Sequence, residues 1–371
     1  MPRSSAYPFT ARRVAEAVYM VCGSAAATGC YAALRHGRLH VMAGGSSASR
    51  SESMREIVYW ILCAFLTVAI AIVSLRYVTN FWLLSFLYSF QVHFGVLFAA
   101  ASLVILAVRR QIYGFVLLFV SLLLIAHGVI MLREFSGDDR GTDRLPLFRL
   151  MSFNIAIDNW TNSTAITNMV IASNADVVNL LEAKPLTFHL QQLFKAYPYH
   201  IGCDTGKDTC DTLVLSKRPF VSRQVASMGS LRKNRLVISS VDFGGETINL
   251  VSAHLSKPYF DDFQMAELED LAKALGSIDG PVVLSGDFNS SSIAPSIQAF
   301  LRKQGLKTIA PEPATWPIAA GSLGIAIDHV FARPPLHLIS LRRLDDNLGS
   351  NHSGLIAEFV LDRNGETSPA K

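Results

Sequence analysis

The chain has 371 residues, of which 50% are hydrophobic and only 17% are charged, and its mean hydropathy is +0.32. A soluble protein is usually about a quarter charged, so this composition argues against an entirely soluble chain. The net charge of +4 hides a division, because residues 1–132 carry 10 Lys and Arg against 3 Asp and Glu, and residues 133–371 carry 23 against 26. The weakly acidic second part lacks the overall positive charge that is typical of nucleic-acid-binding domains.

Residues 1–53 do not define a clear structural unit. The stretch 14–34 is apolar but rich in Ala and Gly and contains Glu16, so it is at best a poor fourth membrane span. The segment 44–49 has the sequence Gly-Gly-Ser-Ser-Ala-Ser and is predicted to be a flexible linker. Met54 stands directly before the first strong apolar run, so a native start at Met54 is an alternative to the start at residue 1.

Three successive apolar runs are long enough to cross a membrane, and they cover residues 57–75, 81–108 and 112–132. The only formal charges between residues 57 and 132 are Arg76, Arg109 and Arg110. A bilayer core about 30 Å thick requires roughly 20 apolar residues in a helix. Three such runs in a row favour transmembrane helices over buried helices of a soluble domain. We therefore expect three transmembrane helices within residues 54–133, with the lipid bilayer as a partner.

The arginines outside these runs predict the orientation of the chain in the membrane. Arg50 and Arg55 precede the first run, and Arg109 and Arg110 separate the second from the third. Positively charged short loops usually stay on the cytoplasmic side. An odd number of spans then exports the C-terminal part, which indicates a multi-pass protein of a bacterial inner membrane with a periplasmic domain. Residues 134–147 are predicted to be a polar linker to that domain.

From residue 148 the pattern changes to short β-like runs that alternate with amphipathic stretches, which is typical of an α/β or α+β domain. The expected strands cover 148–155, 177–181, 212–215, 236–242, 247–254, 282–284, 326–331 and 355–360. The expected helices cover 164–173, 186–196, 263–275 and 295–304. Gly244 and Gly245 are predicted to form the turn of a hairpin. Several strands are apolar on both faces, so we expect a layered sandwich covered by helices.

Six of the apolar runs are bounded by a carboxylate, amide or imidazole group. The residues concerned are Asn154, Glu182, His254, Asp287 with Asn289, Asp328, and Asn351 with His352. A sheet holds side chains rigidly at the ends of its strands, so these groups are candidates for one functional site.

The strand end Gly286-Asp287-Phe288-Asn289, followed later by Ser350-Asn351-His352, resembles the endonuclease/exonuclease/phosphatase superfamily. This superfamily includes pancreatic-type deoxyribonucleases, apurinic endonucleases, bacterial sphingomyelinases and inositol polyphosphate phosphatases. The resemblance spans residues 148–361 and implies a four-layer α/β sandwich with an active site at one edge. The expected fold is therefore N-terminal transmembrane α-helices followed by an α/β (α+β) four-layer sandwich over residues 148–362, with a tail at 363–371.

The resemblance implies a divalent metal, Mg²⁺ or Mn²⁺, held by Asn154 and Glu182. Mg²⁺ accepts one or two carboxylates and keeps several waters, so an open site of this kind suits it. The chain departs from the family pattern in two places. Leu181 replaces the Gln that usually precedes the glutamate, and Asn351, a further expected metal ligand, stands where the family most often has Asp. An amide offers an oxygen but no negative charge.

The resemblance also implies the catalytic roles of five residues. His254 is expected to donate a hydrogen bond to a phosphate oxygen, Asp287 to orient the attacking water, and Asn289 to bind the phosphoryl group. Asp328 is expected to hold the imidazole of His352. An Asp and His pair can then handle the proton while a metal neutralises charge on the phosphate.

These residues predict a membrane-anchored, metal-dependent phosphoesterase that hydrolyses a phosphate mono- or diester by direct water attack. The substrate classes that stay open are nucleic acid, nucleotide, phospholipid headgroup and sugar phosphate, and no protein partner is inferred. Endonuclease or exonuclease activity is the commonest inference for this superfamily, but an extracytoplasmic domain disfavours DNA repair. A catalytically weak sensor or ligand-binding module is the alternative, motivated by Leu181 and Asn351. A transporter is disfavoured because the spans contain so few charges.

Two further features have both a structural and a functional interpretation. The basic run Arg232-Lys233-Asn234-Arg235 is either a solvated loop, which we favour, or a positively charged segment that attracts a phosphate substrate. Trp316 either packs locally, the commoner case, or stacks on a base, a sugar or a lipid headgroup.

Cysteine usage bears on the compartment. Cys22, Cys30 and Cys63 lie in apolar segments, which leaves Cys203 and Cys210 in the polar domain. The residues between this pair form a turn-rich loop that a disulfide closes easily, whereas two thiols make an incomplete zinc site. A disulfide between Cys203 and Cys210 would agree with an extracytoplasmic domain.

Overall fold

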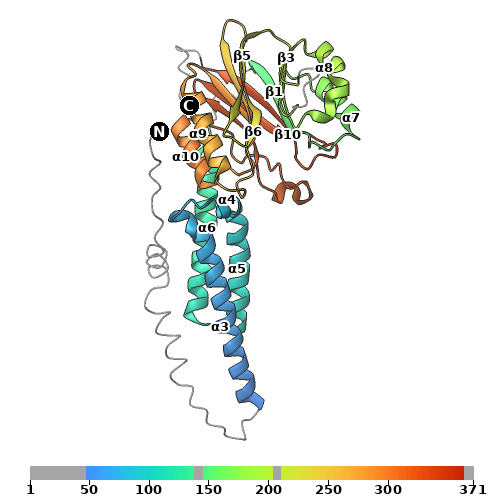
Figure 1. The fold of residues 1–371 in the computed structure, drawn as a ribbon. Helices are drawn as coiled ribbons and strands as arrows, with labels where there is room; N and C mark the ends of the chain where they lie inside the picture. Colours follow the sequence, from blue (N-terminus) through green and yellow to red (C-terminus); the bar gives the residue numbers. More distant parts are fainter. Residues whose placement is uncertain (1–46, 138–144, 204–209, 363–371) are drawn as a thin grey trace. The chain divides into compact units, whose positions relative to one another are not determined.

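The computed structural model describes residues 47–137, 145–203 and 210–362 (Figure 1). The stretch 14–34 and the tail 363–371 lie outside these residues. The chain divides into two compact units, which are residues 1–79 with 91–126, and residues 80–90 with 127–371.

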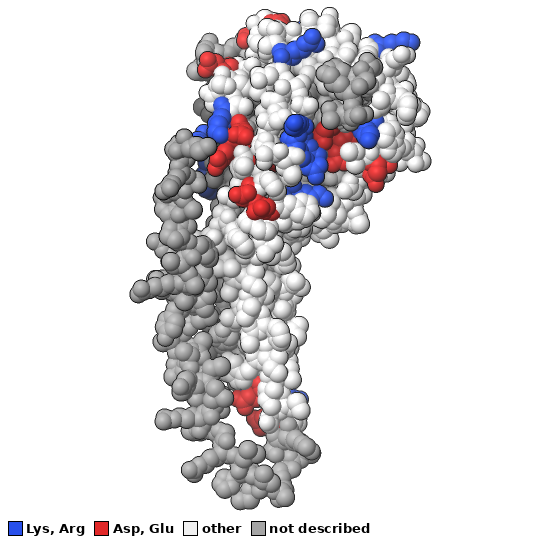
Figure 2. Space-filling model, viewed as in Figure 1, with Lys and Arg blue, Asp and Glu red and all other residues white. Residues whose placement is uncertain are grey.

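The first unit consists of long apolar helices. They are α3 (Ser47–Ser74), which continues into the short helix η1 (Leu75–Tyr77), α5 (Gln91–Val108) and most of α6 (Ile112–Glu134). Three segments are long and apolar enough to cross a membrane, with 27, 18 and 23 residues and mean hydropathies of 2.5, 2.1 and 2.7. Figure 2 shows a long uncharged surface on the visible face of these helices. The expectation of three apolar spans is therefore confirmed, although α3 begins at Ser47, inside the expected linker.

Packing within this unit brings the start of α3 close to the end of α5. Arg109 Nη1 lies 3.1 Å from Glu56 Oε1. Close contact between α5 and α6 depends on Gly95, because a Cβ there would lie 2.7 Å from the Ile125 side chain. The helices therefore run up and down, with Arg55 and Arg109 near the same end.

The second expected span was wrong in its extent. The run 81–108 is not one helix, because a break at Ser89 and Phe90 separates α4 (Trp82–Tyr88) from α5. The helix α4 belongs to the second unit, together with the C-terminal domain. Hydropathy does not distinguish an apolar segment in lipid from one that packs against protein, and this explains the error.

The second unit contains two sheets. One has the strand order β10-β11-β1-β2-β4-β3 and the other β5-β6-β7-β8-β9. The strands of the first sheet are β1 (Phe148–Asn154), β2 (Val177–Leu181), β3 (Tyr199–Ile201), β4 (Leu213–Ser216), β10 (Leu336–Arg343) and β11 (Leu355–Leu361). Those of the second sheet are β5 (Phe220–Met228), β6 (Arg232–Asp242), β7 (Thr247–His254), β8 (Val282–Asp287) and β9 (Asp328–Arg333).

Three apolar layers hold the domain together. One lies between the two sheets and includes the stacked rings of Phe148, Phe243 and Phe359. The outer face of the β5–β9 sheet is covered by α9 (Phe263–Gly276) and α10 (Pro295–Gln304). The other sheet is covered by α7 (Ser163–Ala172), η2 (Lys184–His189) and α8 (Leu190–Ala196), as Figure 1 shows. Helix, sheet, sheet and helix form the expected four-layer sandwich, and the short helix η3 (Ile318–Leu323) precedes β9.

The strands that carry polar groups at their ends were predicted well, including the edge strand β9, whereas the other three edge strands were missed. The expected strands 177–181 and 247–254 match β2 and β7, and the hairpin at Gly244 and Gly245 joins β6 to β7. Three strands had no counterpart in the expectations, namely β3, β5 and β10. Helix α6 extends to Glu134, whose carboxylate accepts a hydrogen bond of 2.8 Å from Arg302 on α10.

Candidate active site

Three neighbouring strands place polar side chains in one row at an edge of the β5–β9 sheet. His254 pairs with Asp287 across the parallel strands β7 and β8. Asp287 in turn pairs with Asp328 at the start of the antiparallel strand β9. Gly286 allows this row to form, because its φ is +144° and a Cβ there would lie only 1.9 Å from the carbonyl oxygen of Ala253.

The carboxylate of Asp287 lies at the centre of these polar side chains. Its Oδ2 accepts a hydrogen bond of 3.0 Å from Asn154 Nδ2, which comes from the other sheet. Its Oδ1 accepts one of 2.7 Å from the backbone N–H of Asn289. The Nε2 atoms of His254 and His352 lie 3.7 Å and 3.9 Å from Asp287 Oδ2. Burial raises the pKa of Asp287, and the charge of His352 opposes this rise. A carboxylate of raised pKa is suited to accept a proton near neutral pH.

His352 and Asp328 form a buried pair beside this carboxylate. His352 Nδ1 lies 2.8 Å from Asp328 Oδ2, which leaves Nε2 directed toward Asp287. Burial lowers the pKa of His352, but the charges of Asp328 and Asp287 outweigh it and raise that pKa to about 9. The imidazole is therefore held in its protonated form at neutral pH.

His254 has a carboxylate partner that the sequence interpretation missed. Its Nδ1 lies 2.7 Å from Asp211 Oδ1, and Asp211 Oδ2 lies 2.8 Å from Arg235 Nη2. Burial raises the pKa of Asp211, but the contacts with His254 and Arg235 outweigh it and lower that pKa below its usual value. Arg235, the last residue of the basic run that begins at Arg232, is therefore buried in the domain. Arg232 is exposed.

Glu182 follows β2 and lies beside His254, opposite Asp211 on the same imidazole. Its Oε1 lies 3.8 Å from His254 Nε2, and its Oε2 accepts a hydrogen bond of 2.7 Å from the N–H of Ile157. Glu182 has a φ of +55° and Asn289 a φ of +50°. The left-handed region is unfavourable for a glutamate, and strain of this kind is commonly found at functional sites.

The donor atoms of this group suit a hard divalent cation. Asp287 and Asp328 offer carboxylate oxygens that lie, together with a nitrogen of His352, within 4.8 Å of one another. The protonated His352 offers no lone pair, so the carboxylate oxygens are the candidate ligands of this group. Asp328 Oδ1 is buried and makes no hydrogen bond among the described residues. An unpaired carboxylate oxygen in such a place requires compensation, which a cation supplies. The structure therefore contains a candidate metal site, and it lies beside the Glu182 and Asn154 pair.

Of the eight residues expected at the site, seven are brought together by these contacts. They are Asn154, Glu182, His254, Asp287, Asn289, Asp328 and His352. Asn351 is exposed, and none of the described hydrogen bonds joins its side chain to this group.

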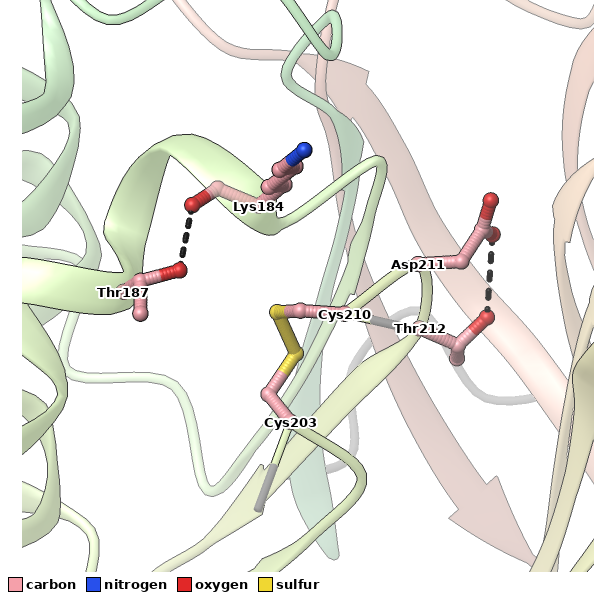
Figure 3. Close-up of a disulfide and its surroundings, with 6 residues drawn as sticks. All are labelled: Lys184, Thr187, Cys203, Cys210, Asp211 and Thr212. Atoms are coloured by element: carbon pink, nitrogen blue, oxygen red, sulfur yellow. Dashed lines mark hydrogen bonds between the residues drawn. A yellow bond between two sulfur atoms is a disulfide. The ribbon is translucent and has the colours of Figure 1, made fainter. Parts of the chain in front are cut away.

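The expected disulfide between Cys203 and Cys210 is present, with a Cα to Cα distance of 4.4 Å (Figure 3). It lies directly before Asp211, the partner of His254. The backbone carbonyl of Asp211 also accepts a hydrogen bond of 3.0 Å from the N–H of Ala183, next to Glu182. The disulfide thus anchors the segment that carries one carboxylate of the site.

Comparison with solved structures finds similar chains of low sequence identity. D. rerio TDP2 complexed with single strand DNA product is 18% identical, with a TM-score of 0.48, and the match covers 57% of this chain and 98% of that one. Beta toxin from Staphylococcus aureus is 16% identical, with a TM-score of 0.45 and coverage of 57% and 99%. An endonuclease/exonuclease/phosphatase from Beutenbergia cavernae is 20% identical, with a TM-score of 0.45 and coverage of 58% and 71%. A comparison with curated protein sequences gives no match.

A family model gives the decisive match. The model of the Endonuclease/Exonuclease/phosphatase family matches residues 151–352. That range is more than half of the chain and runs from β1 to His352. It contains every residue of the group around Asp287. The chain therefore belongs to the Endonuclease/Exonuclease/phosphatase family of phosphoester hydrolases.

Proposed function

We propose that the protein is a membrane-anchored, divalent-metal-dependent phosphoesterase that hydrolyses a phosphate mono- or diester by direct attack of water. The observation that carries this proposal is the buried carboxylate of Asp287, which lies between two imidazoles and two amide groups. Such an arrangement combines a proton acceptor with several hydrogen-bond donors around one small space. It favours an enzyme over a module that only binds its ligand.

Each side chain has a role that its contacts support. Asp287 accepts the proton of the attacking water, because burial raises its pKa. The protonated His352, held by Asp328, and His254, held by Asp211, donate hydrogen bonds to phosphate oxygens. Asn289 orients the phosphoryl group beside them.

Glu182, Asn154, Asp328 and Asn351 are the residues that would hold Mg²⁺ or Mn²⁺, with Asp328 added to the expected ligands because its Oδ1 is unpaired in the described structure. When bound, such an ion neutralises charge on the phosphate and polarises its phosphorus–oxygen bond. Asn351 is exposed beside His352 and would contribute the weakest ligand.

The three apolar helices support a multi-pass membrane anchor within residues 54–133, with residues 148–362 as the catalytic domain. Arg55 and Arg109 lie near one end of the helices of the first unit, which favours the cytoplasmic side for that end. Helix α4 connects α3 to α5 and folds with the catalytic domain. An odd number of spans exports both α4 and the domain, which supports a periplasmic catalytic domain in a bacterial inner membrane. The Cys203 to Cys210 disulfide agrees with that compartment.

The test is hydrolysis of bis-p-nitrophenyl phosphate by the purified full-length chain in detergent, with EDTA and after addition of Mg²⁺ or Mn²⁺. We expect activity only with a metal, and Asp287→Ala should reduce turnover by at least about a hundredfold, the usual contribution of a general base. Near-normal turnover by Asp287→Ala, or full activity in EDTA, would show that the site is wrongly assigned.

A further inference from the structure

Helix α4 lies between two apolar spans in the sequence but packs on the catalytic domain. Ser291 donates a backbone hydrogen bond of 3.0 Å to Ser89 Oγ, at the end of α4. The ring of Phe86 makes edge contacts with Tyr259 and Trp316, with centroids 5.4 Å and 5.8 Å apart. These contacts are all made within the second unit, so α4 is part of the catalytic domain.

The partners of α4 belong to the three loops that border the active site. Ser291 follows Asn289 by two residues, and Tyr259 follows His254 by five. The residue before Trp316 is Thr315, whose Oγ1 accepts a hydrogen bond of 3.1 Å from the N–H of Asp328.

Thr315 also accepts a backbone hydrogen bond of 2.9 Å from Ser353, the neighbour of His352. Phe86 and Ser89 therefore contact one residue in each of the three loops that border the active site. We name Phe86, Tyr259, Phe260 and Trp316 the aromatic rim.

Chain length limits how far this rim can lie from a bilayer that α5 crosses. Gln91, the first residue of α5, is three residues after Tyr88, the last residue of α4. Three extended residues span at most about 11 Å. Helix α5 has 18 residues, or about 27 Å at about 1.5 Å per residue, so it needs its whole length to cross a hydrocarbon core of about 30 Å. A helix of this length that crosses the bilayer places Gln91 near the boundary between lipid and water, and chain connectivity alone then keeps the end of α4 within about 11 Å of that boundary.

Exposed apolar side chains on and beside the rim suit this position. Phe81 is 42% exposed and Leu83 is 51% exposed, and both belong to the α4 segment. Phe260, on the loop after His254, is 53% exposed. Exposed Phe and Leu side chains are typical of protein segments that bury an apolar face at the boundary between headgroups and acyl chains. The domain face in Figure 2 mixes basic and acidic side chains and shows no continuous basic surface for a nucleic acid.

We propose that the substrate is the phosphoester of a membrane lipid headgroup, which reaches the active site along the bilayer surface past the aromatic rim. This proposal rests on the proposed phosphoesterase function. Water forms the new phosphorus–oxygen bond and one ester oxygen of the headgroup leaves. The proton of the water passes to Asp287, and the leaving oxygen takes a proton from His352.

The experiment compares four substrates with the full-length chain and Mg²⁺, namely lipid in vesicles, a short-chain lipid, a soluble diester and an oligonucleotide. The chain is reconstituted in vesicles of phosphatidylcholine, phosphatidylethanolamine and phosphatidylglycerol, and water-soluble phosphate products are measured. Bis-p-nitrophenyl phosphate and a single-stranded DNA oligonucleotide are tested in parallel. We expect release of headgroup products from the vesicles, and faster turnover of lipid in vesicles than of the same headgroup on a short-chain lipid below its micelle concentration.

Phe260→Ser tests the rim. The variant removes an aromatic ring that would be partly buried in lipid. The ratio of lipid turnover to soluble-diester turnover should therefore fall by roughly fivefold. Val221→Ser is the matched control. Val221 is 64% exposed at the start of β5, which lies at the opposite end of its sheet from His254. This control should leave both rates unchanged.

The outcomes separate the two proposals. Hydrolysis of the soluble diester without release of any lipid product, or a preference for the oligonucleotide, would overturn the lipid proposal and leave the phosphoesterase intact. An unchanged ratio in Phe260→Ser would also overturn the role of the rim. No hydrolysis of any of the four substrates would instead refute the phosphoesterase function itself.

Discussion

Replacing Asp328 by Asn tests whether a charge pair keeps His352 protonated. Both side chains are buried, and His352 Nδ1 lies 2.8 Å from Asp328 Oδ2. Burial alone lowers the pKa of His352, yet Asp328 and Asp287 raise it to about 9. Compared with the ordinary histidine pKa of about 6.5, this rise favours the imidazolium by about 3 kcal/mol. Asn keeps the shape of Asp but carries no charge, so burial should prevail and the pKa of His352 should fall by at least about 2 units.

The sign of the stability change follows from the raised pKa. The pair stabilises the fold fully below about pH 6.5, and this contribution is lost as the pH rises through about 9, where His352 gives up its proton. The melting temperature of the wild-type protein should therefore decline across that window. Asp328→Asn should remove most of the decline and should lower the melting temperature at neutral pH.

The assay is an NMR titration of histidine-labelled, metal-free protein in detergent micelles, in which His352→Gln identifies the signal. Asp362→Asn is a matched control, because it removes a carboxylate 3.1 Å from a different histidine, His337. That control should leave the pKa of His352 at about 9. A pKa of His352 in Asp328→Asn within about half a unit of the wild-type value would refute the reasoning, because half a unit is far less than the shift that loss of the charge requires.

Three other changes test the rest of the site. Glu182→Gln should raise the Mg²⁺ concentration needed for half-maximal activity, since the amide keeps the size of the side chain but loses its charge; an unchanged metal titration would contradict a ligand role. Asn351→Asp should tighten Mn²⁺ binding measured by calorimetry, and unaltered affinity would place residue 351 away from the ion. Replacing Cys203 and Cys210 by Ser should lower the free energy of unfolding by about 2 kcal/mol, as measured by urea titration, and should also reduce turnover because Asp211 loses its anchor. Lower stability with full turnover would show that the disulfide does not position Asp211.

The strands that carry the site could be predicted because they are buried on both faces. β2 and β8 are buried along their whole length, so each appears in the sequence as a continuous apolar run that stops at a polar group. β5 and β10 lie at the edges of their sheets and are largely exposed or half-buried, so neither has such a run. Edge strands are commonly polar, because an exposed apolar edge promotes aggregation.

Asp211 was missed for a topological reason. Most of the predicted site residues stand at the ends of apolar strands, whereas Asp211 stands before the start of β4. β4 is antiparallel to β2, so its start lies at the same sheet edge as the end of β2, next to Glu182. Asp328 at the start of antiparallel β9 obeys the same geometry. A rule that includes the starts of antiparallel strands would have found Asp211, although only the fold shows that it faces His254.

The boundary at α4 could not be predicted from hydropathy, and it changes how the enzyme must be studied. Phe86 of α4 packs on Tyr259 and Trp316, and packing against protein selects the same apolar side chains as contact with lipid does. A fragment that begins after α6 would lack Phe86 and Ser89. Tyr259 and Trp316 would then lose their contacts with Phe86, and the loop that follows Asn289 would lose the hydrogen bond from Ser291 to Ser89. Weak activity of such a fragment would therefore reflect the loss of α4 rather than a defect of the catalytic groups, and this is why substrates have to be compared on the full-length chain.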